Sequence, residues 1–92
     1  MKTRIVHCKK ENFDIYIGRP SIWGNPFAVG RHGSREQVIE KYKEHVLQDP
    51  LLMARIMELD GKILGCWCPP EHCHGDSLIE IIQGIKKGEI KR

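Results

Sequence analysis

Three of the four cysteines of this 92-residue chain lie close together and end beside histidines. Thiolate and imidazole groups are preferred zinc ligands, and three cysteines with one histidine form a common tetrahedral site. Cys66, Cys68, Cys73 and His74 supply such a set, in which His72 can replace His74. The C-x-C spacing differs from that of zinc fingers. The adjacent Cys73 and His74 can both bind one ion only where the backbone turns sharply, as a junction between a strand and a helix permits. We therefore predict a zinc site in this segment.

The same segment fits a reactive thiol. Cys73 comes just before a predicted helix, whose N-terminal N–H groups stabilise a thiolate. His74 or His72 would activate this nucleophile, and Asp76 would orient the imidazole as in a catalytic triad. A structural interpretation also stays open, in which the cysteines fill the core and Asp76 caps the helix. Cys8 is expected in the core rather than among the ligands.

A long loop carries candidate ligand-binding residues. Arg19 offers a fork of donors suited to phosphate or carboxylate, and Asn25 can both donate and accept. Trp23 can stack on a planar ring, while Arg31 comes shortly before a helix N-terminus, where anions bind. The loop thus predicts a pocket for a small anionic, nucleotide-like ligand that meets the Cys/His segment. In the alternative, Trp23 caps a small core and the arginines are solvated.

The apolar pattern predicts an α/β (α+β) fold in the order β-β-loop-α-α-β-α. A small three-stranded sheet would carry about three helices packed on it, and the first two strands are expected to form a hairpin. Side chains alternate along a strand, so Cys66 and Cys68 share one side of the last strand. We expect strands at 3–8, 13–17 and 62–67, a loop at 18–33, and helices from Ser34 to Asp49, from Asp49 to Gly61 and from about Gly75 to Lys87.

Specific residues mark the helix ends. Ser34 and Gln37 have the spacing of a capping box, which opens the first helix. Asp49 and Pro50 are typical of a helix N-cap and first position, and Gly61 is typical of a C-terminal stop. The boundaries of the first two predicted helices therefore depend on capping chemistry as well as on apolar periodicity.

Length and composition limit the class of protein. Ninety-two residues, 40% of them hydrophobic and 29% charged, indicate a single globular domain over 1–92 and exclude disordered, collagen-like and coiled-coil chains. No segment approaches the roughly 18 apolar residues of a membrane span. The N-terminal residues lack the apolar stretch of a signal peptide, so a cytoplasmic location is expected, where disulfides are rare.

The net charge of +3 does not by itself indicate nucleic-acid binding. The last residues, 87–92, form a basic tail that is expected to fray. A nucleic-acid or protein-binding module remains an alternative function, and it would bind in a strongly salt-dependent way. The residues that would serve it are Lys86, Lys87, Lys91 and Arg92.

Two motifs in combination resemble a known family. The R-P-S-x-W-G-N-P-F-like loop at 19–27 and the C-W-C…C-H-G-D-like segment at 66–76 resemble the domain-of-unknown-function family 4326, small proteins of bacteria, archaea and phages. His72 is not part of the family pattern, which favours His74 as the functional imidazole. The family has no assigned reaction, so the resemblance implies which residues matter and no activity. The pattern falls on Arg19, Pro20, Gly24, Asn25, Pro26, Phe27, Cys66, Cys68, Cys73, His74 and Asp76.

Overall fold

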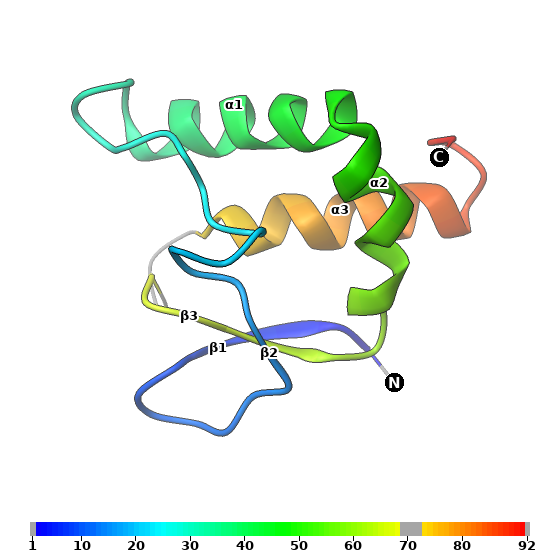
Figure 1. Ribbon diagram of the computed structural model, residues 1–92, viewed down its shortest axis with the longest axis horizontal. Coiled ribbons are helices and arrows are strands. Elements are labelled where there is room, and N and C mark those ends of the chain that lie inside the picture. Colours follow the sequence, from blue (N-terminus) through cyan, green and yellow to red (C-terminus); the bar gives the residue numbers. More distant parts are fainter. Residues whose placement is uncertain (1, 69–72, 92) are drawn as a thin grey trace.

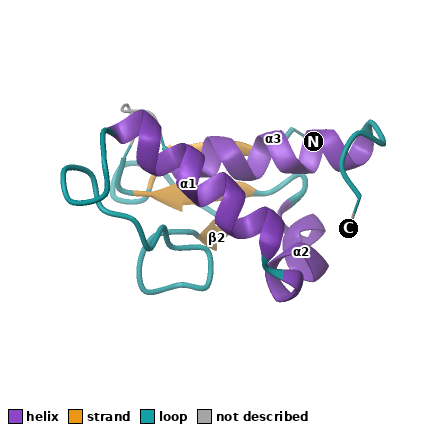
Figure 2. Ribbon diagram, turned by 90° about the horizontal axis from the view of Figure 1, so that it is seen from above, coloured by secondary structure: helices purple, strands orange, loops and turns teal. Residues whose placement is uncertain are grey.

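A three-stranded sheet carries three helices, as predicted, and Figure 1 shows the helices on one face of the sheet. The structure is a computed structural model that describes residues 2–68 and 73–91. In Figure 1, α3 lies between α1 and the sheet, and seen from above α1 runs obliquely over α3 (Figure 2). The predicted order is confirmed, except that the second helix continues as a 3₁₀ helix. The elements are β1 (Arg4–His7), β2 (Ile15–Tyr16), α1 (Arg35–Gln48), α2 (Pro50–Arg55), η1 (Ile56–Leu59), β3 (Ile63–Cys66) and α3 (His74–Lys86).

The central strand is β3, and both neighbours run parallel to it in the order β1-β3-β2. Leu64 of β3 lies opposite Ile5 on one side and Ile15 on the other. The expected hairpin is therefore wrong, because β1 and β2 do not pair with each other. The connection between them returns along the outside of the sheet, where the Phe13 ring occupies the space that a side chain at Gly65 would need.

The predicted capping residues are confirmed. The Ser34 hydroxyl accepts from the Gln37 N–H at 3.2 Å, and the Gln37 side chain accepts from the Ser34 N–H at 2.8 Å. Asp49 caps α2 by accepting from the Leu51 and Leu52 N–H groups. Gly61 follows η1 with φ +76°, a left-handed conformation that favours glycine. The caps at Ser34 and Asp49 fix where α1 and α2 begin, and Gly61 lies where the chain turns into β3.

The core lies between the helices and the inner face of the sheet. Leu64 and Cys66 point into it from β3, as alternation along the strand predicts. Trp23 is also part of this core and is only 4% exposed. Among the described residues, the largest side chains that are fully buried are Tyr42, Ile17, Ile56, Leu59, Leu64, Leu78, Ile81 and Ile82.

The described residues after α3 fold back on the helix. The N–H groups of Glu89 and Ile90 donate to the Gly84 carbonyl at 2.8 and 3.1 Å. Ile90 packs against the core, and Lys86 forms an ion pair with Asp60 at 3.2 Å. Arg92 lies outside the described residues. None of the described helices is both long and apolar enough to span a membrane.

Candidate metal centre

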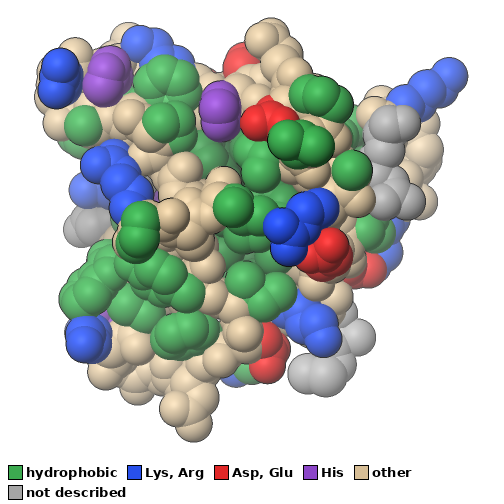
Figure 3. Space-filling model, viewed as in Figure 1, with side chains coloured by type: hydrophobic (Ala, Val, Ile, Leu, Met, Phe, Trp, Pro, Cys, Tyr) green, Lys and Arg blue, Asp and Glu red, His purple; other side chains and the backbone are tan. Residues whose placement is uncertain are grey.

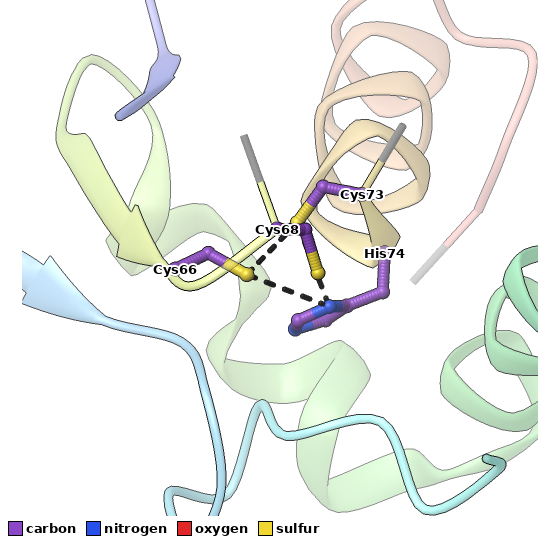
Figure 4. A group of neighbouring side chains, drawn as sticks. All are labelled: Cys66, Cys68, Cys73 and His74. Carbon is purple, nitrogen blue, oxygen red and sulfur yellow. Dashed lines mark hydrogen bonds between the residues drawn. The ribbon is translucent and has the colours of Figure 1, made fainter. Parts of the chain in front are cut away.

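The end of β3 and the start of α3 bring the four predicted ligands together (Figure 4). Cys66 is the last residue of β3, Cys73 is the N-cap of α3, and His74 is the first residue of that helix. Together with Cys68, their ligand atoms all lie within 4.8 Å of one another. The four residues thus converge although the strand and the helix approach from different directions.

The distances in this cluster fit a single small cation. Cys66 Sγ lies 3.0 Å from Cys73 Sγ and 4.0 Å from His74 Nδ1, and Cys73 Sγ lies 3.6 Å from that nitrogen. Ligand bonds of about 2.0–2.3 Å around tetrahedral zinc place neighbouring ligand atoms about 3.5–3.8 Å apart. Modest side-chain adjustment therefore suffices for all four residues to surround one zinc ion.

The imidazole of His74 is held in place by groups outside the cysteine cluster. Its Nε2 lies 2.8 Å from the carbonyl oxygen of Ile17, which can only accept, so Nε2 carries the hydrogen. The Tyr42 ring meets the imidazole edge-on at 4.9 Å between centroids. Nδ1 is thereby directed at the thiols, in the arrangement by which a backbone carbonyl fixes a metal-binding histidine.

Cys73 and Asp76 form the cap of α3. The Cys73 thiol accepts from the Gly75 N–H at 3.4 Å, and the Asp76 carboxylate accepts from the Cys73 N–H at 3.2 Å. Both ring nitrogens of His74 contact other groups. The structure therefore gives Asp76 a role in capping the helix.

Hydrogen bonds within the cluster and burial shift the pKa values of its members. Hydrogen bonds from Cys66 and Cys73 lower the pKa of the Cys68 thiol, whereas hydrogen bonds to Cys66 and Cys68 raise the pKa of Cys73. Burial lowers the pKa of His74, but its hydrogen bonds to Cys66 and Cys68 outweigh burial and raise it to about 9. These opposed shifts favour negative charge on Cys68 and positive charge on the neighbouring imidazole. A divalent cation would provide more positive charge at the same place and allow further thiols to ionise.

Cys73 lacks the properties of an exposed nucleophile. It is 2% exposed, and its pKa is raised, whereas reactive cysteines are accessible and have lowered pKa values. Cys68 is the half-buried member of the cluster, and Cys8 is half-buried outside it. Burial keeps the Cys73 thiol away from solvent, and binding of a metal would require this thiol to ionise.

A cavity of about 300 Å³ lies beside the cluster, and its walls come from both predicted motifs. Cys68 and His74 line it from one side, and Arg19 and Asn25 line it from the loop. The loop and the Cys/His segment therefore meet at one site. The complete lining is Tyr16, Gly18, Arg19, Asn25, Phe27, Val29, Arg35, Val38, Ile39, Cys66, Trp67, Cys68 and His74.

Arg19 and Asn25 also hold the loop in shape. The Arg19 guanidinium donates from Nε to the Asn25 carbonyl at 2.7 Å and from Nη2 to the Phe27 carbonyl at 3.3 Å. The Asn25 side chain accepts from the Phe27 N–H at 2.9 Å and donates to the Val38 carbonyl at 3.3 Å. A side chain at Gly24 would lie 3.1 Å from the Arg19 Cα, so the loop packs closely there.

Two other predicted ligand-binding residues lie elsewhere. Trp23 packs in the core, and its hydrophobicity explains this placement, while Arg31 is exposed and does not line the cavity. Arg35 lines the cavity instead, together with Trp67. The capping box placed Arg35 at the first position of α1, which was the available signal for it. His72 lies outside the described residues.

Comparison with known proteins finds relatives of uncharacterised function. An uncharacterized 12.4 kDa protein in the nrdA-td intergenic region of Enterobacteria phage T4 is 36% identical over 93 residues, covering 96% of this chain and 84% of the phage protein. An uncharacterized protein of Acanthamoeba polyphaga mimivirus is 37% identical over 95 residues, covering 84% of this chain and 72% of the viral protein. No solved structure gives a significant match. The model of the domain of unknown function DUF4326 matches residues 2–84, and the chain belongs to this family.

Proposed function

We propose that this domain binds one zinc ion through Cys66, Cys68, Cys73 and His74 and takes a small anion in the adjoining cavity. The observation that carries the metal site is the convergence of three thiols and one imidazole nitrogen within 4.8 Å. Soft thiolates combined with imidazole favour zinc over magnesium, calcium or manganese. The hydrogen bond between His74 and Ile17 adds the outer support that metal-binding histidines use.

Four protein ligands leave no open coordination position, so the proposed role of the metal is structural. Cys66 and Cys68 would hold the end of β3 against Cys73 and His74 at the first turn of α3. His74 would extend this connection to Ile17 through its Nε2 hydrogen bond. The metal centre would thereby form one wall of the cavity and keep its shape.

The charge of the cavity lining supports an anionic ligand. Among the described residues that line it, Arg19 and Arg35 carry positive charge, and there is no Asp or Glu. Guanidinium groups bind carboxylate and phosphate through paired hydrogen bonds. Because Arg19 comes from the loop and Arg35 from the start of α1, an anion would be held between two elements.

Metal analysis combined with thiol titration tests the zinc site. Purified tag-free protein should hold one zinc per chain. The thiols of Cys66, Cys68 and Cys73 should react only after a chelator is added. The thiol of Cys8 should react without a chelator. Cys66→Ser, Cys68→Ser and Cys73→Ser should each bind zinc more weakly, and Cys8→Ser is the matched control that should bind it normally. The proposal is wrong if zinc-supplemented protein takes up no metal and all four thiols react freely.

The second candidate function is that of an enzyme with a reactive thiol, and the surroundings of Cys68 favour it. Its thiol lines the cavity, and hydrogen bonds from Cys66 and Cys73 lower its pKa. Alkylation of metal-free protein, read by peptide mass spectrometry, should then modify Cys68 before Cys73. The zinc proposal adds that bound zinc protects Cys68, so rapid alkylation of the zinc-loaded protein would favour the thiol enzyme.

A further inference from the structure

Trp67 is an exposed ring held in a fixed place next to the metal cluster. It lies between Cys66 and Cys68 in the sequence and is 55% exposed. Its Nε1 donates to the Tyr16 hydroxyl at 2.9 Å, and that hydroxyl donates to the Arg19 carbonyl at 2.9 Å. A large apolar ring left in solvent but fixed by hydrogen bonds is already positioned to stack, so binding would cost it little conformational entropy.

Other groups support the same ring. The His7 ring meets the indole edge-on at 5.7 Å, and the Lys9 ammonium lies 5.5 Å from its centroid. Figure 3 shows hydrophobic side chains gathered at the lower left of the molecule, with Lys and Arg side chains beside them. With His7 and Lys9 beside it, the Trp67 ring has an aromatic and a basic neighbour, a combination that suits a planar ligand with negative charge.

The ring and the cations face one cavity. Trp67 and Tyr16 line it together with Arg19 and Arg35. At about 300 Å³ the cavity is at the lower end of the range for ligand pockets, which fits a single nucleotide better than a dinucleotide. An anion without a ring would use only the guanidinium side of this cavity.

We propose that the cavity binds a nucleoside monophosphate, with its base stacked on Trp67 and its phosphate between Arg19 and Arg35. This inference rests on the proposed anion pocket and names the class of its ligand. The stacking residue is Trp67 rather than Trp23, because Trp23 is buried in the core. The phosphate would bridge the loop and the first turn of α1, while the base would cover the exposed indole.

Titration calorimetry on zinc-loaded protein tests the inference. The probes are AMP, GMP, CMP and UMP, with the matching nucleosides and inorganic phosphate as comparisons. At least one monophosphate should bind saturably, and its nucleoside and inorganic phosphate should each bind at least 10-fold more weakly. Trp67→Ala and Arg35→Gln should each weaken the monophosphate at least 10-fold. Arg31→Gln is the matched control, because Arg31 is exposed and outside the cavity lining.

Tryptophan fluorescence provides an independent readout, since the chain has two tryptophans. The monophosphate should quench the wild-type emission, and Trp67→Phe should abolish the quenching. If Trp23→Phe folds, it should keep the quenching, and if it does not fold, calorimetry on Trp67→Ala decides. Thermal melts of each variant check that lost binding is not lost folding.

Four outcomes would overturn the inference. These are no saturable binding by any monophosphate, equal binding of nucleosides, equal binding of inorganic phosphate, and tighter binding of a single-stranded oligonucleotide than of any monophosphate. The zinc content of each sample is measured alongside. Failure in protein that holds one zinc per chain overturns the nucleotide inference alone, and equal binding of inorganic phosphate leaves the anion pocket standing. Absence of zinc instead overturns the proposed metal site.

Discussion

His74 Nε2 lies 2.8 Å from the carbonyl oxygen of Ile17, which ties the candidate metal centre to the chain just after β2. The N–H of Ile17 in turn donates to the Gly65 carbonyl of β3 at 2.9 Å. Ile17 is fully buried, so this connection is shielded from water. The peptide groups of a single residue therefore join the central strand to the histidine, and they fix the ring relative to Cys66.

This arrangement predicts that a substitution can remove the metal ligand of His74 and keep its hydrogen bond to the Ile17 carbonyl. In His74→Gln, the side-chain amide can still donate to the Ile17 carbonyl, but the Nδ1 ligand is lost. We expect zinc affinity to fall by more than the roughly 10–100-fold that follows loss of an outer-shell partner. Competition with a chromophoric chelator measures this. Unchanged affinity in the variant would remove His74 from the ligand set.

Removing the metal should lower thermal stability. A ligand present at about 100 times its Kd stabilises the native state by about 2.7 kcal/mol, which for a domain of this size corresponds to a Tm shift on the order of 10 °C. Thermal melts with and without a chelator measure the shift. Cys66→Ser should melt at the same temperature with and without the chelator. If the chelator lowers the Tm of this variant as much as that of the wild type, loss of zinc is not the cause.

Local chemistry made the helix boundaries and the cysteine cluster predictable. Ser34, Asp49 and Gly61 act within a few residues of themselves, so their effects are visible in the sequence. Alternation along β3 likewise placed Cys66 on the buried side together with Leu64. A strand end followed closely by a helix start then made the convergence of the ligands a geometric expectation.

Strand pairing and the cavity lining depended on contacts between distant residues. The runs containing Ile5 and Ile15 suit either a hairpin or two parallel neighbours, and only the insertion of β3 between them decides. Trp23 and Trp67 are the same residue type in similarly apolar surroundings, yet one is 4% and the other 55% exposed. Tertiary packing separates them, so the sequence alone does not show which of the two tryptophans lines the cavity.

The left-handed backbone at Gly61 predicts a graded cost of substitution. Its φ is +76°, and its N–H donates to the Thr3 hydroxyl at 2.7 Å at the entrance to β3. Gly61→Ala should destabilise the fold by about 1–2 kcal/mol, and Gly61→Asn by less, because asparagine tolerates this conformation better. Urea unfolding measures both. Equal losses for alanine and asparagine would indicate that side-chain crowding, rather than backbone conformation, sets the cost.

Tyr42 connects the loop to the metal centre, and its hydroxyl should matter for stability but not for zinc. The side chain is fully buried, its hydroxyl donates to the Trp23 carbonyl at 2.7 Å, and its ring packs on His74. Burial, followed by the charges of Cys73 and Cys66, raises the pKa of Tyr42, so the hydroxyl remains a donor.

Tyr42→Phe removes this donor and leaves the Trp23 carbonyl unpaired in the core, which should cost about 1–3 kcal/mol. The ring that packs on His74 stays, so zinc stoichiometry should not change. Tyr16→Phe is the matched control for stability, because its hydrogen bond to the Arg19 carbonyl is exposed and water can replace it, and we expect a loss within about 0.5 kcal/mol. Urea unfolding and metal analysis of the two variants decide. Loss of zinc in Tyr42→Phe would show that the hydroxyl positions the ligands, and equal destabilisation of both variants would contradict the buried hydrogen bond as the source of the effect.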